Sequence, residues 1–71
     1  MASAKLAVRG MTCDHCRQTV ENALRGVAGT FGAAVFLAEA EAEVDFDATK
    51  ASRDDYVRAV AASGYSATPV A

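Results

Sequence analysis

The order in which apolar residues change their spacing constrains the fold of this chain more than any other feature. Apolar and polar residues alternate near the N-terminus, as in a half-buried strand, and around residues 16–27 apolar residues recur every three or four positions, as on one helix face. Two more alternating segments, a second helical segment and a short strand-like segment follow. The predicted order is strand, helix, strand, strand, helix, strand.

Glycines and capping residues mark where these segments end. The first strand, with Leu6 and Val8 on one side, runs into Gly10. We expect Asp14 to cap the first helix. Its apolar stripe consists of Cys16, Val20, Leu24 and Val27. The second helix should begin at a variant capping box and end at Gly64, with an apolar side. That side consists of Tyr56, Val57, Val60 and Ala61.

The two middle strands, around residues 33–38 and 42–46, predict an antiparallel hairpin. Their connection near Glu39 and Ala40 has no glycine, asparagine or proline, so turn chemistry leaves the register open. Pro69 in the last strand requires an edge or terminal position. We assign four aromatic residues to the core or to a face of the sheet: Phe31, Phe36, Phe46 and Tyr56.

This order of elements is that of an α+β fold, the ferredoxin-like βαββαβ sandwich. In it, two helices cover one face of a four-stranded antiparallel sheet. A chain of 71 residues has room for one small domain, so we expect residues 1–71 to form a single domain.

Charge and hydropathy exclude several kinds of partner. Nine acidic residues against seven basic ones give a net charge of −2, which argues against nucleic acid and against an acidic membrane surface. The longest apolar stretch, residues 31–38, is too short for direct membrane insertion. The first residues lack the pattern of a secretory signal, so we expect a cytoplasmic protein.

Cys13 and Cys16 are the only cysteines, and their two-residue gap lets both sulfurs reach one metal ion. In a reducing cytosol such a pair indicates metal binding or catalysis more often than a structural disulfide. Thiolates select soft ions, and Cu(I) and Hg(II) are both satisfied by two sulfurs. Zn(II) prefers four ligands, and only Asp14 and His15 lie nearby to complete such a set.

The two cysteines should differ in their surroundings. Cys16 falls in the first turn of the helix, where free amides and the helix dipole should lower the pKa of its thiol. Cys13 should be exposed on the loop, where a third thiolate from a partner can join the ion. Arg9 and Arg17 flank this loop. They could attract an acidic partner, and the charge of Arg17 could also favour the thiolate.

Several neighbours have two readings. Met11 is either a weak thioether ligand or, as we favour, an apolar anchor for the loop. His15 could join the ion, but the helix should direct it outward. Thr12 and Asp14 are expected to bond loop and helix amides and to leave the metal to the sulfurs.

Some of these residues also carry a resemblance. They are Gly10-Met11-Thr12-Cys13-Asp14-His15-Cys16, then Val20, Ala23, Leu24, Val27 and Gly29, and finally Gly64-Tyr65. The chain resembles the heavy-metal-associated domain family. This family includes cytosolic copper chaperones and the N-terminal domains of copper- and zinc-exporting P-type ATPases and of mercuric reductases. The chain departs from the family pattern at residues 29–33.

The resemblance implies a metallochaperone-type domain that is not an enzyme. It would bind one ion, Cu(I) before Hg(II), through Cys13 and Cys16 and pass it by thiolate exchange to a partner such as a P-type ATPase metal-binding domain. Tyr65 would then pack beside the metal loop, with plain core packing as the other reading.

Two alternatives to a copper carrier stay open. One is the Hg(II)-binding domain of a mercury-resistance system, either from a mercuric reductase or a free carrier. The other is a thiol-disulfide oxidoreductase, which would have a different strand order and a cis-proline beside the dithiol. We expect a monomer, with a dimer bridged by metal through four sulfurs as the alternative.

Overall fold

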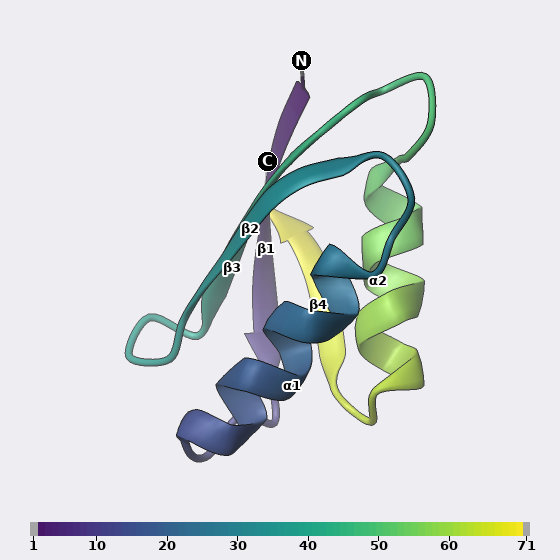
Figure 1. The fold of residues 1–71 in the computed structure, drawn as a ribbon. Coiled ribbons are helices and arrows are strands. Elements are labelled where there is room, and N and C mark those ends of the chain that lie inside the picture. Colours follow the sequence, from purple (N-terminus) through teal and green to yellow (C-terminus); the bar gives the residue numbers. More distant parts are fainter. Residues whose placement is uncertain (1, 71) are drawn as a thin grey trace.

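The computed structural model describes residues 2–70 and contains the predicted elements in the predicted order. These are β1 (Ala2–Arg9), α1 (Asp14–Arg25), β2 (Thr30–Phe36), β3 (Glu41–Phe46), α2 (Arg53–Ala62) and β4 (Ser66–Val70). The strands form one antiparallel sheet in the order β2-β3-β1-β4. Both helices lie on one face of this sheet (Figure 1). The predicted ferredoxin-like sandwich is therefore confirmed.

The core lies between the sheet and the helices. Alternation along β1 and β3 directs every second side chain toward the helices. Those buried side chains are Ala4, Leu6, Val8, Ala42, Val44 and Phe46. The helices contribute Val20, Leu24, Tyr56 and Val60, all fully buried. Burying each such side chain contributes about 1.5–3 kcal/mol. The predicted apolar side of α2 was wrong at Ala61, which is exposed because it lies about 100° around the helix from Val60.

The helix starts differ in how well they were predicted. Residue Cys13, and not Asp14, is the N-cap of α1, and Asp14 is the first helical residue. The carboxylate of Asp14 binds Arg17 instead of capping the helix, with Arg17 Nε 2.7 Å from Asp14 Oδ1. At α2 the predicted capping box is present, since the backbone N–H of Ser52 donates to Asp55 Oδ2 at 2.9 Å.

The hairpin between β2 and β3 has two features that the sequence did not predict, an unusual turn residue and a bulge. Ala40 adopts a φ of 53°, the left-handed conformation that glycine or asparagine usually supplies. At the other end of β2 the pairing with β3 shifts between Thr30 and Gly32, so Phe31 is an extra, bulged residue. Phe31 and Phe36 are 64% and 41% exposed, whereas Phe46 and Tyr56 pack together in the core with ring centroids 5.3 Å apart.

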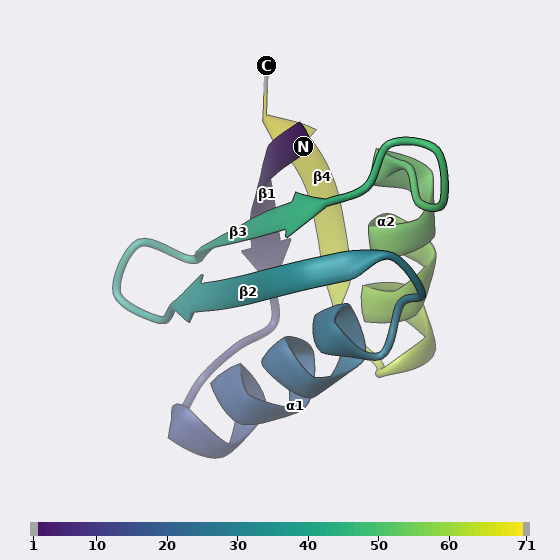
Figure 2. The ribbon, with the colours of Figure 1, turned by 45° about the horizontal axis from the view of Figure 1, so that its top comes forward.

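The sheet register brings two distant loops together. Arg9 pairs with Ser66 across β1 and β4, so the segment after β1 lies beside the segment that precedes β4. Figure 2 shows these loops at the same end of the molecule. β4 is an edge strand, as Pro69 required. Among the described residues, no helix has the length and apolar character needed to cross a bilayer.

Candidate metal site

The structure places the two cysteine sulfurs 3.5 Å apart at the N-terminus of α1. Cys13 is extended at the N-cap, and Cys16 lies in the first helical turn, so the helix geometry directs both side chains to one point. Both are free thiols. Cys13 is exposed, as predicted for a loop residue, and Cys16 is half-buried.

The pKa of Cys16 is lowered from 9.0 to about 6 by hydrogen bonds that favour its thiolate. The largest contribution comes from the backbone of Thr12, followed by the side chains of Tyr65, Cys13 and Thr12. The direction of this shift is the predicted one, and the structure adds hydrogen bonds that the sequence did not predict. The donors come from the loop before the helix and from the segment before β4, and not mainly from the helix amides.

Tyr65 lies beside this pair, as the resemblance implied. The pKa of Tyr65 is raised, chiefly because its hydroxyl keeps its proton more tightly when it interacts as a donor with the Cys16 sulfur. The ring passes close to the backbone at Gly10, where an added Cβ would lie 3.2 Å from Tyr65 Cδ1. Gly10 also has a φ of 99°, which disfavours other residues. The ring of Tyr65 thus packs against the backbone of Gly10, which has no side chain to block it.

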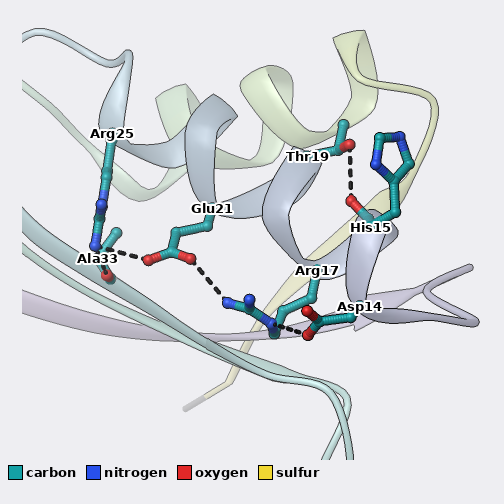
Figure 3. Close-up of polar contacts among 7 residues, drawn as sticks. All are labelled: Asp14, His15, Arg17, Thr19, Glu21, Arg25 and Ala33. Atoms are coloured by element: carbon teal, nitrogen blue, oxygen red, sulfur yellow. Dashed lines mark hydrogen bonds and ion pairs between the residues drawn. The ribbon is translucent and has the colours of Figure 1, made fainter.

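Met11 and His15, two further residues near the cysteine pair, differ in their burial. Met11 is half-buried and packs against the core, which agrees with an anchoring role. Figure 3 shows the ring of His15 directed away from Asp14 and Arg17, and His15 is exposed. Within residues 2–70, no three histidine, cysteine, aspartate or glutamate side chains are grouped so that they could hold an ion. That Met11 and His15 leave the ion to the sulfurs stays a prediction.

A ladder of four charged residues runs along α1 from the metal loop (Figure 3). Arg17 binds Asp14 at 2.7 Å and Glu21 at 2.9 Å, and Glu21 binds Arg25 at 2.7 Å. The guanidinium of Arg17 is therefore held by two carboxylates and is absent from the groups that lower the pKa of Cys16. The structure thus gives Arg17 a place in this ladder, and an effect of its charge on the thiolate stays a prediction. Opposite charges spaced three and four residues apart in 14–25 were the signal for this ladder.

The chain is similar to a known domain family and to several known proteins. Residues 5–66 match the family model described as the heavy-metal-associated domain. The copper chaperone CopZ of Staphylococcus haemolyticus is 37% identical over 65 residues, which cover 92% of this chain and 96% of CopZ. The mercuric transport protein periplasmic component of Shigella flexneri is 47% identical over 60 residues, 84% of this chain and 66% of that protein.

Larger proteins contain the same unit. The copper-transporting ATPase HMA4 of Oryza sativa subsp. japonica is 42% identical over 67 residues, which are 94% of this chain but only 7% of the ATPase. Among solved structures, a copper binding domain from HMA7, a P-type ATPase, superposes with a TM-score of 0.97 at 35% identity, covering 100% of this chain and 96% of that one. The chain therefore belongs to the heavy-metal-associated domain family and is related to copper chaperones and to a metal-binding domain of a P-type ATPase.

Proposed function

We propose that this chain carries one Cu(I) ion on Cys13 and Cys16 and passes it to a partner protein by thiolate exchange. The observation that carries the proposal is the pair of free, accessible sulfurs 3.5 Å apart at the start of α1. Thiolates prefer soft ions. The pKa of about 6 for Cys16 supports binding at neutral pH, since the ligand is then already deprotonated.

The scarcity of further ligands, and not the spacing of the sulfurs, favours an ion with few ligands, since within residues 2–70 no three histidine, cysteine, aspartate or glutamate side chains are grouped so that they could hold an ion. Bonds of about 2.3 Å, the zinc–thiolate length, would enclose about 100° at an ion held by sulfurs that are 3.5 Å apart. A linear arrangement needs sulfurs about 4.6 Å apart. Cys13 can supply that movement because it is exposed at the N-cap. Asp14, a candidate further ligand for Zn(II), is already bound to Arg17, which disfavours a four-ligand site.

Exposure of Cys13 also supports transfer. A thiolate of the partner adds to the ion and gives a three-sulfur intermediate. The bond to Cys13 then breaks first, because this residue is the more accessible of the two, and a second thiolate of the partner replaces Cys16 last. The ion is transferred from one protein to the other without entering free solution, and its oxidation state does not change. The protein acts as a carrier and not as an enzyme.

The relatives suggest the kind of partner. Because one relative is a copper chaperone and others are copper ATPases, we infer that the partner is a metal-binding domain of a P-type ATPase, or a protein that delivers copper to it. Such an exchange would take place in the cytoplasm. The carrier is then a monomer during transfer, and residues 1–71 act as one domain.

A mercury carrier is the second candidate, and the Shigella flexneri relative favours it. Hg(II) is also satisfied by two thiolates, so the sulfur pair alone does not separate the two ions. Competition between the ions does. We expect the reduced protein to bind one Cu(I) with an affinity that survives a strong Cu(I) chelator, and Cys13→Ser and Cys16→Ser to lose it.

The outcomes of this titration are distinct. Tight Cu(I) binding by either serine variant would contradict the ligand set. Hg(II) binding that persists in the presence of competing low-molecular-weight thiols, together with weak Cu(I) binding, would favour the mercury carrier. A thiol-disulfide oxidoreductase, the remaining alternative, would reduce insulin disulfides with multiple turnovers, and we expect no such turnover.

A further inference from the structure

The outer edge of β2 is a feature that the metal site does not use. β2 is an edge of the sheet, so within residues 2–70 only β3 pairs with it. Residues 26–38, which include all of β2, contain no charged residue. Edge strands usually carry lysine, proline or inward-facing charges, because bare backbone N–H and C=O groups recruit another strand. β2 itself carries none of these, and its protection is limited to a bulge at Phe31 and one contact from Arg25 of α1.

The opposite edge is protected. β4 has only five residues, and one of them is Pro69, which cannot donate a backbone hydrogen bond. A chain with one pairing edge forms a closed pair when two copies meet, and not an open-ended stack.

A contact of Arg25 indicates which backbone groups of β2 point toward its outer edge. Arg25 Nη2 donates to the backbone oxygen of Ala33 at 3.4 Å, so the backbone of Ala33 is directed outward. Backbone groups alternate sides along an antiparallel strand. Val35 is therefore also directed outward, while Ala34 is directed toward Glu43, its partner in β3.

We propose that two copies of this chain pair through the outer edges of their β2 strands, antiparallel and about a two-fold axis at Ala34. This register places Ala33 opposite Val35 and Phe36 opposite Gly32. The ring of Phe36, which is 41% exposed, then covers a glycine of the other copy. Because β2 carries no charged residue, the β2 strands of two copies can pair without repulsion between like charges.

The pairing is weak and metal-independent. It involves about five residues of each copy, and its area falls below the roughly 1,200 Å² of a stable interface. The bulge at Phe31 ends the paired segment on one side. Arg25 must leave the Ala33 oxygen before a strand can bond there, so this side chain limits the association.

Dilution of the reduced protein tests the proposal. The protein carries Cys13→Ser and Cys16→Ser together with a chelator, so that no metal bridge forms. We expect the sedimentation mass to rise from 7.3 kDa toward twice that value with concentration, and amide resonances of residues 32–36 to shift in parallel. Shifts confined to β4 or to the metal loop, or a mass that stays monomeric at millimolar protein, would overturn the proposal.

Matched variants locate the interface. Ala34→Lys puts two like charges at the two-fold axis and should abolish association, while its position opposite Glu43 preserves the fold. Thr68→Lys makes the same change on the other edge strand, β4, and should leave association unchanged. Arg25→Ala should strengthen association about two- to thirty-fold, because one exposed charged contact is lost in each of the two copies. Equal loss in both lysine variants would also refute the assigned edge.

Discussion

Replacing Tyr65 by phenylalanine should raise the pKa of Cys16 and leave the fold intact. The hydroxyl of Tyr65 is the second largest of the four contributions that together lower this pKa from 9.0 to about 6. Its removal should therefore raise the pKa by about one unit. At pH 7 the thiolate fraction of Cys16 then falls from about 90% to about 50%.

The assay is the pH dependence of iodoacetamide alkylation, followed on the tryptic peptide of residues 10–17. Fragmentation of this peptide separates Cys13 from Cys16. Since a thiol becomes reactive as it loses its proton, the midpoint for Cys16 should move to higher pH in Tyr65→Phe. The two thiols titrate together, so the midpoint belongs to the pair.

Tyr56→Phe is the matched control, because it removes the only other tyrosine hydroxyl of the chain. Tyr56 is buried in the core and bonds Thr30, so this variant should leave the Cys16 profile unchanged. An unchanged profile in Tyr65→Phe, or an equal shift in both variants, would refute the assigned hydrogen bond.

Three further predictions concern stability, each checked by urea unfolding. Gly29→Ala should cost about 2–3 kcal/mol, because Gly29 has a φ of 93° and its added Cβ would lie 2.7 Å from Lys50 Cβ; a loss under 0.5 kcal/mol would contradict this packing. Tyr56→Phe should cost about 1 kcal/mol, the value of its 2.7 Å hydrogen bond to the Thr30 hydroxyl, and no loss would mean that the bond does not form. Ala40→Gly should stabilise by about 0.5–1 kcal/mol, because glycine adopts the φ of 53° without strain, and destabilisation would argue against that conformation.

The elements of this fold were predictable because their signals are local. The alternation around Leu6 and Val44 and the glycine after α2 are read within a few residues, and the core forms where they indicate. The hairpin turn was not predictable, because Ala40 takes a conformation that its side chain disfavours and that only the flanking strands impose. The same holds for the bulge at Phe31, which exists only in the pairing of β2 with β3.

The site was predictable in its residues but not in its electrostatics. The spacing of Cys13 and Cys16 fixes their proximity once a helix begins between them. The donors that lower the pKa of Cys16 include Tyr65, which is 49 positions away in the chain and arrives through the pairing of β1 with β4. A cap was assigned to Asp14 from its residue type, yet an arginine one turn later competes for that carboxylate.

The charge ladder on α1 has a consequence for how this protein meets others. Its two acids and two bases sum to zero, and each is neutralised by its neighbour within 3 Å. A helix of this kind projects little long-range field into solvent. The rate of association through this face of α1 should therefore be nearly the same at low and at high ionic strength.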